Sequence, residues 1–122
     1  MKNSIDFDDI TKELAEILKQ KNKAYGNSFD KTMDKWGMTP LGIRLDDKIG
    51  RIDNMLQEGI LSENGESLLD NLFDLAGYSV LAIRYLVANR KLLPSDIKKY
   101  FDDYDDESED KPVYDREDKE WI

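Results

Sequence analysis

Hydrophobic positions near the start of the chain recur at helical spacing. Ile10, Leu14 and Ile17–Leu18 follow one another at steps of four, three and one residue, which predicts an amphipathic helix over about residues 6–23. Acidic residues in its first turn and lysines in its last turn complement the helix macrodipole. Gly26 is expected to end this helix.

Two further helices are predicted by the pattern of caps and apolar residues. Ser28 is expected to cap a short helix that Gly37 stops. Thr39-Pro40 supplies a capping hydroxyl and a proline for the first helical position, which predicts a helix from there to about Glu58, closed by Gly59. The short helix carries Phe29, Met33 and Trp36, and the long one presents Leu41, Leu45, Ile49, Ile52 and Leu56 on one face.

The most apolar segment comes last. Asn64-Gly65 marks a turn, and the next helix is expected over about residues 66–89, with no strand anywhere in the chain. This helix is apolar on most sides, so we expect it to be central or shared with a second subunit. Pro94 is expected to begin a further short helix. The predicted fold is an all-α bundle of three main helices plus short ones, completed by homo-oligomerisation.

Composition narrows the chemistry that is available. The 122 residues include no His and no Cys, and the length suits one domain. Thiol and Ser/His nucleophiles, disulfides, zinc fingers and iron–sulfur clusters are therefore excluded. Any metal must be held by oxygen ligands, which favours a hard cation such as Mg²⁺ or Mn²⁺.

Charge is concentrated at the C-terminal end. The net charge is −9, and residues 95–122 hold 12 of the 27 acids and 5 of the 18 bases, so this segment carries −7. We expect a domain over residues 1–94 and an acidic tail over 95–122 that is disordered beyond its short helix or engages a basic protein partner. The chain has no basic surface for duplex DNA and no apolar run for a membrane, which predicts a cytoplasmic protein.

Two stripes of polar residues accompany the two longest helices. Glu66, Asp70 and Asp74 follow one another at steps of four, and Tyr78 continues the line; Arg44, Asp47, Lys48 and Arg51 form the second stripe. If the helices pack antiparallel, the stripes face each other and can bind a divalent cation and phosphate. Spacing alone favours the plainer alternative, a solvated face with weak surface pairs. The like charges of Asp70 and Asp74, however, need something to offset them.

Aromatic residues offer a second candidate surface. Tyr25, Phe29 and Trp36 could form a wall against a nucleotide base, but burial in the core is the commoner role for such residues and is the one we expect. The glycines do not have the spacing of a phosphate-binding loop.

Three blocks of sequence resemble a known family. KNKAYGNSF (residues 21–29), RLDDKIGR (44–51) and ESLLDNLFDLAGY (66–78) occur in the order found in the nucleotide modification associated domain 1 family, which is common in phages and prophages. That family is similar to the MazG-type all-α nucleoside triphosphate pyrophosphohydrolases. The resemblance covers about residues 10–88 and implies a phage-type protein of nucleotide metabolism.

The resemblance also implies roles for individual residues. It assigns Mg²⁺ (or Mn²⁺) to Asp47, Asp70 and Asp74, catalysis to Asp74 and Glu66, and substrate binding to Lys48, Arg51, Arg44, Tyr25 and Tyr78. The implied reaction is the hydrolysis of a (deoxy)nucleoside triphosphate to a monophosphate and pyrophosphate.

The chain departs from the family pattern at three positions. Ala24, Arg51 and Asn71 stand where acids are expected. Two hypotheses therefore stay open: a hydrolase in which lysine and arginine replace some of the metal charge, and a non-catalytic module that binds a nucleotide or a protein.

Overall fold

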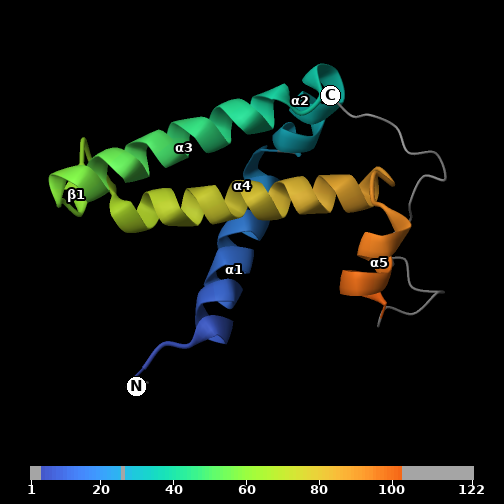
Figure 1. Cartoon of the computed structure of the whole chain (residues 1–122), viewed down its shortest axis with the longest axis horizontal. Coiled ribbons are helices and arrows are strands. Elements are labelled where there is room, and N and C mark those ends of the chain that lie inside the picture. The colour runs from blue at the N-terminus through green and yellow to red at the C-terminus, as the bar shows by residue number, and fades with distance from the viewer. Residues whose placement is uncertain (1–3, 26, 103–122) are drawn as a thin grey trace. The chain divides into compact units, whose positions relative to one another are not determined.

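The computed structural model describes residues 4–25 and 27–102, and in this part of the chain it is almost entirely helical (Figure 1). The all-α character predicted from the sequence is thereby confirmed. Gly26 and most of the predicted acidic tail lie outside the described residues. The elements are α1 (Phe7–Tyr25), α2 (Ser28–Trp36), α3 (Thr39–Glu58), β1 (Ser62–Glu63), β2 (Glu66–Ser67), α4 (Leu68–Ala88) and α5 (Pro94–Phe101).

The ends of α2 and α3 agree with the predicted stop signals but not with the predicted caps. Gly37 and Gly59 follow the last helical residues with φ of 70° and 65°, a conformation that glycine adopts without steric cost. The predicted capping roles of Ser28 and Thr39 are wrong, because each is already the first helical residue and the cap positions belong to Asn27 and Met38.

A two-stranded hairpin corrects the prediction that the chain has no strand. Ser62 pairs with Ser67 and Glu63 with Glu66 in antiparallel register. The two residues between them, Asn64 and Gly65, both have positive φ (53° and 82°), as the tightest hairpin turns require. Glu66 therefore lies in β2, two residues before the start of α4 at Leu68, rather than in the first turn of that helix.

A reciprocal cap fixes the start of α4. The Ser67 hydroxyl accepts a hydrogen bond from the backbone N–H of Asp70 (2.8 Å), and the Asp70 carboxylate accepts one from the backbone N–H of Ser67 (3.0 Å). This is a capping box, in which the serine and the acid three residues later each satisfy an otherwise unpaired donor. These two hydrogen bonds with Ser67 lower the pKa of Asp70 below its ordinary value.

The lowered pKa of Asp70 predicts an acid-dependent contribution to stability. A carboxyl whose pKa falls on folding stabilises the folded state above its unfolded pKa, and the contribution disappears as the pH drops through the folded value. Asp70→Asn should therefore lower the free energy of unfolding at neutral pH, and lower it by less at a pH below the ordinary pKa of an aspartate. Urea unfolding at both pH values measures this, with Asp46→Asn, at an exposed position of α3, as the control. A deficit of the same size at both pH values would contradict the assignment.

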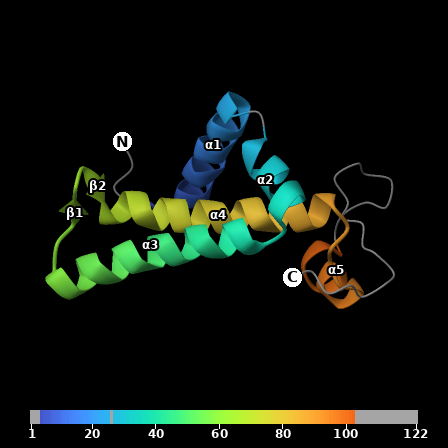
Figure 2. The same ribbon diagram turned by 90° about the horizontal axis from the view of Figure 1, so that it is seen from above.

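The structure divides into two compact units between Ser79 and Val80. In the first, α1 runs across the first half of α4 on a different side from α3 (Figures 1 and 2). Gly77 permits this close approach, because a Cβ atom there would lie 3.3 Å from a methyl group of Leu18 and 3.9 Å from one of Leu14. The buried apolar side chains described in this unit are Met33, Leu41 and Met55.

Burial differs from the sequence prediction at three apolar positions. Ile49 and Leu56, predicted on the buried face of α3, are mostly exposed, whereas Leu45 and Ile52 of the same stripe are half-buried. The expectation that Trp36 belongs to the core is wrong, because its ring is mostly exposed with Lys35 over it.

The second unit contains the rest of α4 and α5, with Ala82 and Tyr85 as its buried apolar residues among those described. Within residues 4–25 and 27–102, none of the helices combines the length and the apolar character that a membrane span requires.

Candidate functional site

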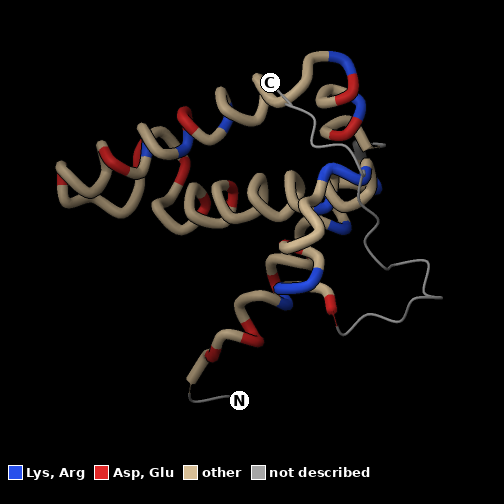
Figure 3. Tube along the Cα trace, turned by 45° about the vertical axis from the view of Figure 1, so that its right-hand side comes forward, with Lys and Arg blue, Asp and Glu red and all other residues tan. Residues whose placement is uncertain are grey.

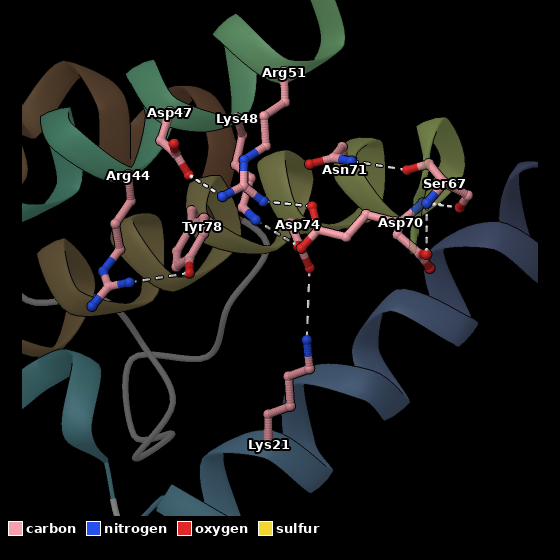
Figure 4. A network of polar contacts seen from close by, with 11 residues as sticks. Lys21, Arg44, Asp47, Lys48, Arg51, Ser67, Asp70, Asn71, Asp74 and Tyr78 are labelled. Carbon is pink, nitrogen blue, oxygen red and sulfur yellow. Dashed lines mark hydrogen bonds and ion pairs between the residues drawn. The ribbon is translucent and has the colours of Figure 1, made fainter. Parts of the chain in front are cut away.

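Polar side chains of α3 face those of β2 and of the first half of α4. The Arg44 guanidinium donates to the Tyr78 hydroxyl (3.4 Å), and Lys48 pairs with Asp74. Arg51 pairs with Glu66. Because residue numbers rise along α3 as they fall along α4, the two elements are antiparallel. The predicted stripes therefore do face each other (Figure 4).

Asp74 is the centre of this arrangement. Its Oδ2 atom lies 3.0 Å from Lys48 Nζ, and its Oδ1 atom lies 3.6 Å from Lys21 Nζ. One lysine comes from α3 and the other from α1, so each carboxylate oxygen has a cation from a different helix (Figure 4). The Lys48 side chain is only 12% exposed, which makes its pairing less screened by water than a surface ion pair.

Arg51 lies between two acids at the hairpin end of the pair. One of its terminal nitrogens donates to Glu66 of β2, and the other is 3.5 Å from Asp47, one turn earlier on α3. The side-chain hydrogen bond with Glu66, followed by the negative charge of Asp47, raises the pKa of Arg51 above its ordinary value. This guanidinium therefore keeps its positive charge at physiological pH.

Arg44 lies at the other end of the same face. Besides the hydrogen bond to Tyr78, its guanidinium carbon is 5.6 Å from the centre of the Tyr78 ring, which is the range of a cation–π contact. We refer to the residues that meet on this face as the polar layer. It consists of Lys21, Arg44, Asp47, Lys48, Arg51, Glu66, Asp74 and Tyr78.

The predicted metal ligands are not brought together. No group of three or more acidic side chains that could hold a metal ion occurs among the residues that the structure describes. Asp47 pairs with Arg51, Asp70 caps α4 through Ser67, and Asp74 pairs with two lysines. The first half of α4 carries aspartates and no basic residue, and the cations come from its neighbours (Figure 3). The acidic side chains, as they lie in the described residues, do not form the predicted Mg²⁺ or Mn²⁺ site. Metal binding itself stays a prediction.

Asn71 is a buried polar residue on the α4 surface that faces α3. Its side chain is fully buried; the Nδ2 atom donates to the Ser67 carbonyl (2.9 Å), while Oδ1 has no hydrogen-bond partner among the described residues (Figure 4). An unsatisfied buried acceptor destabilises a fold by about 1–3 kcal/mol. An acid at this position, as the family pattern has, would place a further negative charge beside Asp74, since residues three apart share a helix face.

Two residues complete the comparison with the predicted site. The sequence predicts only a helix-end charge at Lys21, whereas its side chain pairs with Asp74. The one sequence signal for a role in the site is that Lys21 lies in the first block of the family resemblance. Tyr25 is the last residue of α1, and its side chain lies outside the described part of the structure, so its predicted role stays a prediction.

Comparison with known proteins adds no assignment. A scan against protein-family models, a search of curated proteins and a search of solved structures each returned no match for this chain.

Proposed function

We propose that this chain binds the phosphate groups of a nucleoside triphosphate on the polar layer. The observation that carries the proposal is the convergence of Lys21 and Lys48, from two different helices, on the single carboxylate of Asp74. Two ammonium groups that contact the two oxygens of one carboxylate are also spaced to contact two oxygens of a phosphate group. A phosphate group is negative like the carboxylate and similar to it in size.

The rest of the layer supports the same ligand. Arg44 and Arg51 extend the row of cations along α3, so the positive groups line up over a length that suits a chain of phosphates. Arginine forms forked hydrogen bonds to phosphate oxygens. The carboxylates of Asp47, Glu66 and Asp74 pair with cations of the layer in the free protein, so an arriving phosphate competes with these carboxylates for the same cations. Tyr78 offers a ring and a hydroxyl at one end of the row.

The family resemblance extends the proposal to a reaction and a cytoplasmic, phage-type setting. A water oxygen would bond to the α-phosphorus, the bond from that phosphorus to the bridging oxygen would break, and pyrophosphate would leave with the electron pair. Asp74 is the carboxylate that we propose to orient this water and take its proton, because the lysines beside it hold it in the layer. The lysines and arginines would stabilise charge on the departing phosphates.

Thermal unfolding in the presence of nucleotides tests the binding. At a hundred times its Kd, a nucleoside triphosphate should stabilise the protein by about 2.7 kcal/mol, which shifts the Tm by several degrees. Lys48→Met should raise the Kd at least about tenfold, because a charged hydrogen bond to phosphate is lost. Lys19→Met, at an exposed lysine of α1, is the matched control and should bind normally.

The thermal unfolding measurements should be made with a panel of ribo- and deoxyribonucleoside triphosphates, each in the presence of Mg²⁺ or EDTA. Pyrophosphate release should be measured in parallel. A shift with release supports the hydrolase, and a shift without release supports a non-catalytic nucleotide-binding module. The absence of any shift would refute phosphate binding and favour a basic protein partner for the acidic tail.

A further inference from the structure

We infer that the acidic segment after α5, residues 103–122, binds the basic cluster of the second unit within its own chain. The basic cluster consists of the five bases that α4, the following turn and α5 contribute to that unit: Arg84, Arg90, Lys91, Lys98 and Lys99. The contact covers a positive surface that would otherwise attract other polyanions. The inference is independent of the proposed nucleotide binding, because every residue of the polar layer belongs to the first unit.

The sign of the charge alternates along the chain. Residues 1–79 hold 15 acids and ten bases, whereas residues 80–102 hold two acids and five bases and carry a net charge of +3. Residues 103–122 hold ten acids and three bases and carry −7. The described part of the second unit is therefore the part of the chain whose charge is complementary to the acidic segment.

The cations of the basic cluster are accessible to an acidic partner. Four of its five bases are exposed, and Lys91 is half-buried. Within residues 4–25 and 27–102, no carboxylate forms an ion pair with Arg90 or Lys98. The Lys99 ammonium lies 5.1 Å from the centre of the Tyr100 ring, which is itself mostly exposed. Carboxylates that approach this surface therefore gain attraction that the described acids do not already supply.

The turn after α4 holds Arg90 in a conformation that is unfavourable for arginine. Its φ is 59°, in the left-handed region where glycine or asparagine is the usual residue at the end of a helix. The backbone N–H of the next residue, Lys91, donates to the Leu86 carbonyl (2.9 Å) and closes α4. The arginine therefore places a guanidinium at this turn at a conformational cost that a glycine would avoid.

The lysines of α5 lie on the solvent side of that helix. Ile97 and Phe101 are half-buried one turn apart, whereas Lys98 and Lys99 are exposed and lie about 100° and about 200° around the helix from Ile97. The helix α5 lies beside the end of α4 across a short turn (Figures 1 and 2). The bases of α4, the turn and α5 therefore gather in one small region.

Chain connectivity favours the chain's own acidic segment as the occupant of this region. The segment begins four residues after Lys99, and residues 103–110 hold six acids and no base. Twenty residues can span up to about 66–72 Å, whereas α5 is about 12 Å long, so length does not limit the contact. A tethered segment of this kind acts at an effective concentration on the order of millimolar. An unlinked acidic partner of equal charge competes poorly against it.

Paramagnetic broadening of NMR signals in the full chain tests the inference. Because the chain has no cysteine, Ser108→Cys provides one attachment site for a nitroxide label in the acidic segment. At low ionic strength the label should broaden the amide signals of residues 84–91, which are remote from it in sequence. About 1 M salt, at which the Debye length is about 3 Å, should restore these signals.

Charge reversal identifies the cations that are responsible. Lys98→Glu/Lys99→Glu should abolish the broadening of residues 84–91 at low ionic strength, because repulsion replaces attraction. Lys31→Glu/Lys35→Glu is the matched control: both lysines are exposed on α2, and Lys35 lies over the Trp36 ring as Lys99 lies over Tyr100. This control should keep the broadening. Circular dichroism must show that each variant keeps its helices.

Neutralising the acidic segment provides a second test that leaves the described helices unchanged. The full chain with the six acids of residues 103–110 replaced by their amides should bind an added fluorescent peptide of residues 103–122 at least about tenfold more tightly than the wild type does. The reason is that the wild type's own segment occupies the cluster. Fluorescence anisotropy at low ionic strength measures both affinities.

Several results would overturn the proposal. They include the absence of salt-sensitive broadening in the labelled chain, its persistence in a folded Lys98→Glu/Lys99→Glu protein, and a peptide that binds both chains equally or neither of them. Broadening that a spin-labelled copy causes in a separate isotope-labelled copy would also overturn it, because the segment would then bind a second molecule.

Discussion

Asp74→Asn is expected to lower nucleoside triphosphate hydrolysis at least about hundredfold while nucleotide binding is retained. A carboxylate that takes a proton from attacking water contributes about 10²–10⁴ to the rate, and an amide of the same shape cannot take that proton. Binding should survive, because Lys21 and Lys48 lose the carboxylate that competes with phosphate for them. Single-turnover pyrophosphate release and calorimetric titration measure the two quantities separately.

The same variant should be less stable than the wild type by about 1 kcal/mol. Lys48 is nearly buried, so it depends on the Asp74 charge more than an exposed lysine would, and the amide oxygen restores only part of the hydrogen bonding. Asp46→Asn, an exposed amide substitution on α3, is the control for both measurements. Unchanged turnover in a folded Asp74→Asn protein would refute the catalytic role of Asp74, and a lost affinity would refute the competition between carboxylate and phosphate.

Gly77→Val is expected to have the largest effect on stability and to weaken nucleotide binding as well. A Cβ atom added at Gly77 would lie 3.3 Å from a methyl group of Leu18, and the two methyl groups of valine would push α1 away from α4. Overpacking of this kind costs about 1–3 kcal/mol, which lowers the Tm by several degrees or more in a domain of this size. Lys21 lies one helical turn beyond Leu18, so its contact with Asp74 should be lost when α1 moves.

Two controls separate packing from helix propensity in this prediction. Gly77→Ala adds one carbon against the flexible end of a leucine and improves helix propensity, so its stability should stay close to that of the wild type. Gly50→Val makes the same change in the interior of α3, where nothing lies within 4 Å of the new Cβ, and should also be tolerated. If Gly50→Val lost as much stability as Gly77→Val, close packing of α1 could not be the cause.

The positions of the helices follow from local features of the sequence. Proline at the start of α3, glycine after α2 and α3 and the 3.6-residue apolar period all act within a few residues, and the observed helices agree with them. At Asn64-Gly65 the sequence predicts the turn but not the strands on either side of it, because strands of two residues carry no alternation of polar and apolar positions.

In the candidate site, too, some features follow from spacing along a helix and others depend on tertiary packing. Spacing along each helix predicted the two polar stripes, and the antiparallel packing then brought Lys48 to Asp74 and Arg51 to Glu66. Spacing could not show that Lys21 of α1 completes the contacts of Asp74, because the path of α1 over α4 depends on Gly77. Nor could it show that Asp70 is taken up by the cap with Ser67 rather than offered to a metal.

The sequence by itself therefore determined the helices, their amphipathic faces and the residue types available for chemistry, because these depend on neighbours along the chain. Only the tertiary structure decided which charge meets which, since a carboxylate flanked by two lysines and one that caps a helix look alike in sequence. It also decided that Ile49 and Leu56 remain exposed, because burial depends on how many helices surround a stripe and not on the stripe itself.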